Sequence, residues 1–295
     1  MDTKNKIIDI VKQAIDLHVH IGPELIPRKY TVPTIIIAEE GNIKGMALKN
    51  HFFSTVPFIA EQPISKLRLI GSVALNSFVG GLNPDAVYAA STLANGPFIV
   101  WFPTVSAKQF LDTSVWEIAP EWVGKKTNMS RRAKNLSGIT LFDKDGTLTE
   151  QTRSVLLAIK RTNAILATGH LSWQESRALV KKAVSLGIKK IILTHCIYKR
   201  IAMPIAVQKE LVSLGAKAEH CFSMFSIDKI PIQDIAREIK EVGAENCILS
   251  SDVGQTFSPS PSEALIQFGL LLQKEGIRLS ELETMLVKNP AELVD

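Results

Sequence analysis

The stretch Asn163–Cys196 reads NAILATGHLSWQESRALVKKAVSLGIKKIILTHC and predicts a strand, a helix and a second strand. The two strand candidates are the runs Asn163–His170 and Lys189–Cys196. Both are apolar over most of their length rather than alternating, which is typical of parallel strands covered on both faces. Between them, Ser172 and Glu175 form a capping box that begins a helix, and a glycine ends it.

Six further runs of this kind continue the alternation along nearly the whole chain. They are Ile15–His20, Gly45–His51, Leu67–Asn76, Pro97–Thr104, Ala216–Cys221 and Asn246–Asp252. Helical segments separate them, and one begins at Asn83-Pro84, an N-cap residue followed by a first-turn proline. This pattern predicts an α/β fold, a (β/α)8 TIM-like barrel that forms a single domain over residues 1–295. An open, doubly wound sheet is the alternative, because strand order cannot be read from one sequence.

The segment between the fourth and fifth strands is longer than the other connections. We expect residues 105–162 to form an elaborated loop over the mouth of the barrel, followed by the fourth helix. Within this segment, Gly124–Asn135 carries five Lys and Arg residues and no acid, which equals the net charge of +5. It has no aromatic residue for base stacking, which argues against a nucleic-acid site. A solvated loop is the first expectation, and steering of an anionic substrate is the second.

The composition is that of a globular protein. With 46% hydrophobic residues in a chain of 295, intrinsic disorder is excluded. Three cysteines, an odd and sparse number, fit free thiols in a reducing compartment. Neither a secretory signal nor an apolar run long enough to span a bilayer is visible. We therefore expect a cytoplasmic protein that acts on a small molecule, binds neither membranes nor nucleic acid, and is compatible with a homo-oligomer.

The histidines lie at or next to the carboxyl ends of the predicted strands. They are His18, His20, His51, His170, His195 and His220. In a β/α barrel these ends converge on the face where active sites are built. His18 and His20 are two residues apart on one strand, so both point into the barrel. Converging neutral imidazoles suit a divalent transition metal, and Asp252 after the last strand adds a carboxylate that can accept a proton from water.

This ordered set resembles the amidohydrolase superfamily, with HxH on the first strand, single histidines after the fifth and sixth, and aspartate after the eighth. The terminal NPAELV is similar to that superfamily's C-terminus, and HVHIGP, LKNH, VGGLNP and FPTV look like an uncharacterised, metal-dependent-hydrolase-like branch. The resemblance implies that His18, His20 and Asp252 hold one divalent metal ion. It implies that His170 and His195 hold a second ion, or that one of them joins the first site. Zn²⁺ is the first expectation, and Mn²⁺ or Fe²⁺ are alternatives.

Several other polar residues are candidates for supporting or substrate-binding roles. Relatives with two metals commonly bridge them with a carboxylated lysine or a glutamate after the fourth strand, where this chain reads FIVWFPT and offers neither. Lys49 could substitute, or it could bind an anion or serve a structural role. His51, Glu219 and His220 are candidates for contacts to the metal ligands or the substrate. Arg28 could clamp a carboxylate or phosphate with two hydrogen bonds.

These observations predict a metal-dependent hydrolase that acts on a small, anionic substrate through metal-activated water, with Asp252 as the base. The segment LFDKDGTLT is a competing signal, because it matches the aspartyl-phosphate motif of haloacid-dehalogenase-like phosphatases. In that interpretation Asp143 is the nucleophile and Asp145 the acid/base, whereas the simpler interpretation is a tight turn before a helix cap. A barrel that binds a metal or a small anion without catalysis is the non-enzyme alternative.

Overall fold

Eight parallel strands form one sheet in the described residues, and their order in space follows the chain from β1 to β8. This computed structural model describes residues 2–24, 27–114 and 138–295. The strands are β1 (Ile15–His20), β2 (Gly45–Lys49), β3 (Arg68–Ala74), β4 (Phe98–Trp101), β5 (Ile165–Ala167), β6 (Ile191–Leu193), β7 (Lys217–Cys221) and β8 (Cys247–Ser250). All eight predicted strands are therefore present, although most are shorter at their carboxyl ends than the apolar runs suggested.

The two edges of the sheet meet just after β8. Val19 and Val253 form a parallel bridge, and the amide of His20 donates to the Val253 carbonyl at 2.8 Å. The amide of Asp252 donates to the His18 carbonyl at the same distance. This contact closes the sheet into a (β/α)8 barrel, as predicted, and the open doubly wound alternative is wrong because β1 and β8 lie side by side.

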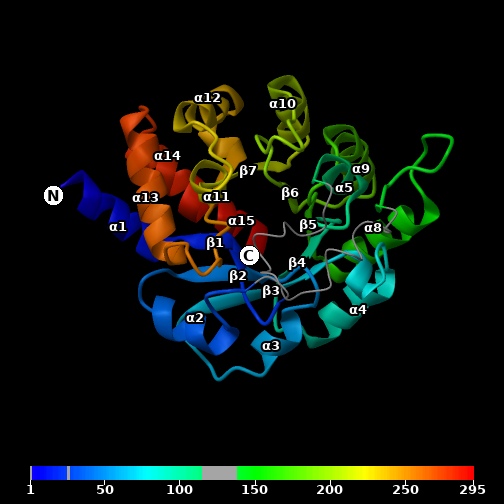
Figure 1. Cartoon of the computed structure of the whole chain (residues 1–295), viewed down its shortest axis with the longest axis horizontal. Coiled ribbons are helices and arrows are strands. Elements are labelled where there is room, and N and C mark those ends of the chain that lie inside the picture. Colours follow the sequence, from blue (N-terminus) through cyan, green and yellow to red (C-terminus); the bar gives the residue numbers. More distant parts are fainter. Residues whose placement is uncertain (1, 25–26, 115–137) are drawn as a thin grey trace.

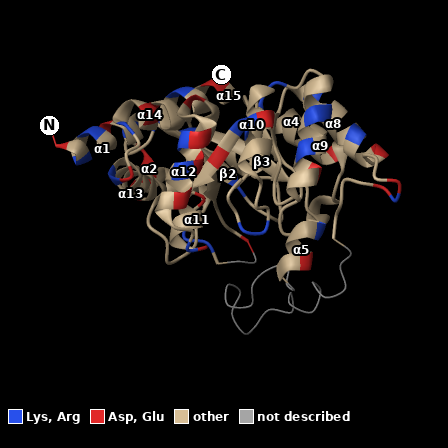
Figure 2. Ribbon diagram, turned by 90° about the horizontal axis from the view of Figure 1, so that it is seen from above, with Lys and Arg blue, Asp and Glu red and all other residues tan. Residues whose placement is uncertain are grey.

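Helices surround the barrel, and most Lys, Arg, Asp and Glu residues lie on these outer elements (Figures 1 and 2). The α-helices are α1 (Thr3–Gln13), α2 (Val32–Glu39), α3 (Val56–Ala60), α4 (Pro84–Leu93), α5 (Lys108–Ser114), α8 (Glu150–Thr162), α9 (Trp173–Ser185), α10 (Ile205–Ser213), α11 (Phe222–Ser226), α12 (Ile232–Val242), α13 (Pro261–Lys274), α14 (Leu279–Glu283) and α15 (Asn289–Val294). Two 3-10 helices, η1 (Ser77–Val79) and η2 (Ala244–Asn246), and one π-helix, η3 (Thr284–Lys288), complete the described helices. Of the helices described, none is both long and apolar enough to cross a membrane.

Apolar side chains form two layers. One layer fills the space between the sheet and the outer helices. The other fills the inside of the barrel, where Trp101 is fully buried, and Leu293 and Val294 of α15 close its amino-terminal end. The inside of the barrel is therefore a packed core, and an active site is expected at its carboxyl end.

The local signals read from the sequence are present. Ser172 and Glu175 make both hydrogen bonds of the capping box before α9, and Asn83 caps α4 by accepting from the Asp85 amide. The long connection after β4 contributes α5 and α8. The basic segment Gly124–Asn135 lies outside the described residues.

Candidate metal centre

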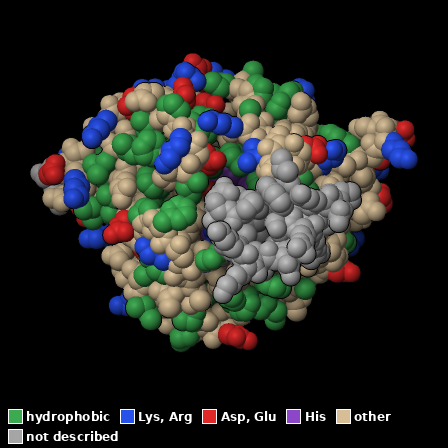
Figure 3. All heavy atoms as spheres, in the orientation of Figure 1, with side chains coloured by type: hydrophobic (Ala, Val, Ile, Leu, Met, Phe, Trp, Pro, Cys, Tyr) green, Lys and Arg blue, Asp and Glu red, His purple; other side chains and the backbone are tan. Residues whose placement is uncertain are grey.

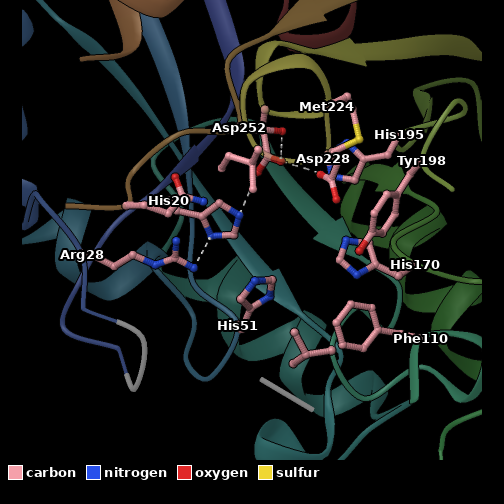
Figure 4. Close-up of a pocket in the computed structure, with 14 residues that line it drawn as sticks. His20, Arg28, His51, Phe110, His170, His195, Tyr198, Met224, Asp228 and Asp252 are labelled. Carbon is pink, nitrogen blue, oxygen red and sulfur yellow. Dashed lines mark hydrogen bonds and ion pairs between the residues drawn. The ribbon is translucent and has the colours of Figure 1, made fainter. Parts of the chain in front are cut away.

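A cluster of imidazoles and carboxylates lies at the carboxyl end of the barrel (Figure 4). His18 and His20 both point inward from β1, with ring centroids 5.3 Å apart. Their Nε2 atoms lie 3.2 and 3.0 Å from the same oxygen, Oδ1 of Asp252. His195 approaches the other oxygen, with its Nε2 3.6 Å from Oδ2. Three histidines therefore surround one carboxylate.

The backbone after β8 holds this carboxylate in place. Asp252 adopts a left-handed conformation, with φ of 50°, while its amide is bonded to β1. Gly254 then passes so close to β1 that a Cβ there would lie 2.1 Å from the His20 carbonyl oxygen. Ser223, just after β7, donates its hydroxyl to Oδ2 of Asp252 at 2.5 Å. Asp252 is thus fixed from both sides by backbone and side-chain contacts.

Glu219 determines which nitrogen of His18 carries the proton. Its two oxygens lie 3.2 and 3.3 Å from Nδ1 of His18, and both side chains are fully buried. Because a carboxylate only accepts, Nδ1 of His18 donates the hydrogen bond. Nε2 of the neutral ring is then an unprotonated atom with a lone pair. A carboxylate behind the imidazole is the usual arrangement for a metal-binding histidine.

His195, just after β6, faces the same carboxylate, but its Nδ1 makes no hydrogen bond to any described residue. Its Nδ1 lies 3.6 Å from Oε2 of Glu219, and its ring stacks on that of His18 at 4.8 Å. His195 follows β6 with a φ of 49°, which turns the ring across the barrel axis. His18 and His195 are therefore both backed by Glu219 and both present Nε2 to Asp252.

His20 is held differently. An Arg28 amino group lies 3.2 Å from its Nδ1, and a guanidinium can only donate. Nδ1 of His20 therefore accepts, and its Nε2–H donates to Asp252. Arg28 is itself paired with Glu24 at 2.5 Å, with both side chains buried. For His20 to offer Nε2 to a metal ion, its contact with Arg28 has to be released.

His170 and His51 line the cup beside this cluster. His170 follows Gly169, where a Cβ would lie 2.2 Å from the Phe102 carbonyl oxygen, so the chain can turn here only with glycine. The Nδ1 of His170 is buried and has no hydrogen-bond partner among the described residues. His51 instead hydrogen-bonds the Thr104 hydroxyl through Nδ1 at 2.9 Å.

Burial keeps these imidazoles neutral. It lowers the pKa of His20, His51 and His170 well below the ordinary value and that of His195 to about 4. Burial alone would raise the pKa of Glu219, but the electrostatic and hydrogen-bond contacts of His18, together with His195, outweigh it and bring that pKa down to about 2. Neutral imidazoles beside ionised carboxylates are the protonation states that a metal site requires.

The donor set fits a divalent metal ion. His18, His20 and Asp252 can bring one ligand atom each within 4.8 Å of one another, as can His18, His195, Glu219 and Cys221. More specifically, the unprotonated Nε2 of His18 faces an unprotonated oxygen of Asp252 at 3.2 Å. Two lone pairs at this distance repel unless a cation lies near both. A positive charge between Nε2 of His18 and Oδ1 of Asp252 would therefore stabilise this arrangement.

Above the cluster lies a cup of about 550 Å³ that is open to solvent. Histidine is visible from this side of the molecule (Figure 3). Arg28 and Gln255 lie on one wall, and Asp228 lies on another. In the described residues, the apolar part of the lining is formed by Val105, Phe110, Tyr198, Met224 and Ile227.

The structure does not bring every candidate residue into the cup. His220 follows Glu219 on β7 and therefore faces the opposite side of the sheet, where both of its ring nitrogens are buried without described partners. The expectation that His220 faces the substrate is thus not met. Lys49 lies below the cup, with its Nζ 3.0 Å from Nε2 of His18. Cys196 is buried away from His195, as the alternation along a strand predicts.

Three residues with contacts to the cluster were missed in the sequence. Glu24 pairs with Arg28 and accepts from the His51 amide, and its spacing of four residues from Arg28 was the available signal. Ser223 stands directly after β7, a position that the strand-end rule already favours. Trp101 forms the floor, with its ring 4.5 Å from that of His18. No sequence signal distinguished it from other core aromatics.

The competing segment LFDKDGTLT forms an exposed turn. Asp143 accepts from the amides of Asp145 and Thr147 and from the Thr147 hydroxyl. Gly146 has a φ of +76°, and Thr149 caps α8. These hydrogen bonds, led by that from the Thr147 hydroxyl, lower the pKa of Asp143. Asp143 is thus occupied by the turn, as the simpler interpretation predicted.

Comparison with known proteins supports the barrel fold. A model described as a family of unknown function (DUF6282) matches residues 13–219. No curated protein matches the sequence.

Among solved structures, an amidohydrolase from Pseudomonas aeruginosa is similar over 100% of this chain and 98% of its own, with a TM-score of 0.66 and 10% identity. A putative 2-pyrone-4,6-dicarboxylic acid hydrolase from Pseudomonas putida covers 96% and 97%, with a TM-score of 0.52 and 11% identity. An organophosphorus hydrolase from Deinococcus radiodurans covers 97% and 94%, with a TM-score of 0.53 and 12% identity. The amidohydrolase-type fold expected from the motifs is therefore confirmed.

Proposed function

We propose, from the premise that this chain belongs to the DUF6282 family and is built on an amidohydrolase-type barrel, that it is a metal-dependent hydrolase of a small, anionic substrate. One observation carries the proposal. His18 and His195, both backed by Glu219, direct Nε2 at the two oxygens of Asp252. Imidazole nitrogens that converge on one buried carboxylate form a donor set that a divalent transition metal ion takes.

The cluster contains residues for both metal ligation and proton transfer. His18, His20 and Asp252 would hold the first ion, with His170 and His195 beside them. A bound divalent cation lowers the pKa of water and polarises the bond that is to be cleaved. The second oxygen of Asp252, which accepts from the Ser223 hydroxyl, would take a proton from water and pass it to the leaving group. The hydroxyl of Ser223 holds that carboxylate in one orientation.

The anionic character of the substrate rests on Arg28. Its side chain reaches the cup from the loop after β1, and Nε is bound to Glu24. When its contact to His20 is released, one amino group becomes free to bind a carboxylate or phosphate. His51, on the neighbouring wall, would then contact the same substrate.

Metal analysis of protein purified without chelator is the primary test. We expect one or two equivalents of Zn, Mn or Fe per chain, and we expect the double variant His18→Ala/His20→Ala to lose at least one of them. His220→Ala is the matched control, since it removes a buried histidine from the other side of β7. Full metal content in the double variant would refute the site.

A substrate panel separates catalysis from simple binding. Lactones, amides and phosphoesters with a carboxylate or phosphate group should be tested with the metal-loaded protein. Turnover that disappears in Arg28→Gln but persists in Lys29→Gln would support the anionic substrate. Tight metal binding without turnover on the whole panel would instead favour a non-catalytic metal-binding barrel.

A further inference from the structure

The side chain of Lys49 points at Nε2 of His18, the atom that would bind a metal ion. It leaves β2 toward the barrel axis, is 1% exposed, and brings Nζ to 3.0 Å from Nε2 of His18. In the described part of the chain, Nε2 of His18 is its only hydrogen-bond acceptor. The same amine lies 4.1 Å from the ring centroid of Trp101, a position that favours a charged ammonium.

The hydrogen-bond directions around His18 agree with this placement. Glu219 holds the proton of His18 on Nδ1, which leaves Nε2 as an acceptor. A lysine ammonium can only donate, so its contact to Nε2 is a proper, charge-assisted hydrogen bond. Lys49 also places positive charge at Nε2 of His18, the atom that faces Oδ1 of Asp252 at 3.2 Å.

We infer that Lys49 is an internal cation that occupies the acceptor of the metal site in the metal-free protein and is displaced when the metal binds. This inference rests on the proposed metal site. The lone pair of His18 Nε2 can be donated either to the metal or to the Lys49 ammonium, but not to both. Metal loading must therefore break a buried, charge-assisted hydrogen bond, and Lys49 lowers the apparent metal affinity.

The alternative to a Lys49 ammonium that competes with the metal ion is a carboxylated Lys49 that binds it. Carboxylation would replace the ammonium by an anion next to Glu219 and Asp252, which already carry negative charge, and above the electron-rich face of Trp101. All three neighbours disfavour that charge. The two arrangements predict opposite changes when the side chain is removed, so a single titration separates them.

The experiment is a Zn²⁺ titration, by calorimetry or chelator competition, of the whole chain with Lys49→Met. Methionine has a similar length and no charge. The net worth of a hydrogen bond to a charged group corresponds to roughly ten- to hundredfold in affinity, so we expect the variant to bind Zn²⁺ tighter by that factor. The metal-free variant should also melt at a lower temperature than the wild type, because the lone pairs of His18 and Asp252 then lack a cation.

Controls distinguish the possible failures. Lys29→Met removes a lysine that is bonded to the Ser258 carbonyl, away from His18, and should leave the affinity unchanged. Lys49→Gln repeats the test if the methionine variant does not fold. Unchanged affinity in Lys49→Met would overturn the inference, and weaker affinity with 44 Da of added mass on Lys49 in the wild type would replace it with the carboxylated ligand. Absence of Zn²⁺ binding by the wild type would instead refute the proposed function.

Discussion

Replacing Glu219 by glutamine tests the arrangement on which the metal centre depends. Glu219 accepts from Nδ1 of His18 at 3.2 Å and lies 3.6 Å from Nδ1 of His195. Glutamine has the same shape, but only one of its two terminal atoms can accept a hydrogen bond. One of the two oxygens that face Nδ1 of His18 is then replaced by an amide group that donates, which weakens the preference for the tautomer that exposes Nε2. Partners of this kind typically change metal affinity by 10- to 100-fold, or about 1.4–2.7 kcal/mol.

The assay is a Zn²⁺ titration of Glu219→Gln and wild type in the presence of a competing chelator. Glu238→Gln is the matched control, because Glu238 is a buried carboxylate that pairs with Gln208 at 3.0 Å, outside the cup. Thermal melting of both variants establishes that they are folded. Wild-type affinity in Glu219→Gln, or an equal loss in Glu238→Gln, would refute the proposed orienting role.

Three further variants test the base, the turn and the chain path. Asp252→Asn should keep much of the metal but lose roughly 10²–10⁴-fold in kcat, the usual worth of a general base, and near-wild-type turnover of the metal-loaded variant would contradict this role. Asp143→Asn should leave turnover nearly intact, because that carboxylate only closes an exposed turn; a loss of several orders of magnitude with a trapped phospho-aspartate would reverse this conclusion. Gly169→Ala should destabilise the protein by about 1–3 kcal/mol or more in urea unfolding, since its φ is +65° and the new Cβ would collide with the Phe102 carbonyl; unchanged stability would mean that the loop relaxes freely.

The strand ends were predictable because their signals are local. The run Phe98–Trp101 is apolar at every position, which indicates burial on both faces, and glycine and capping residues mark the helices between such runs. The positions of His18, His20 and Asp252 at strand ends follow from those runs alone. Because parallel strands in a barrel share one carboxyl end, their convergence could also be expected.

The partners of these residues could not be read in the same way. His195 and Asp252 turn toward each other through backbone conformations with positive φ, which local propensity does not predict for either residue type in particular. The side of the sheet on which His220 lies also depended on the register of β7, because a shift of one residue would exchange its position with that of Glu219.

The sequence by itself determined the alternation of strands and helices and the chemical types gathered at one end of the barrel. Only the tertiary structure decided that Glu219 stands behind two histidines, that Arg28 contacts His20, and that Lys49 points at His18. The physical reason is one of range. Periodicity and capping act over a few residues, whereas the hydrogen-bond directions that give each imidazole its role depend on atoms brought together from opposite walls of a closed barrel.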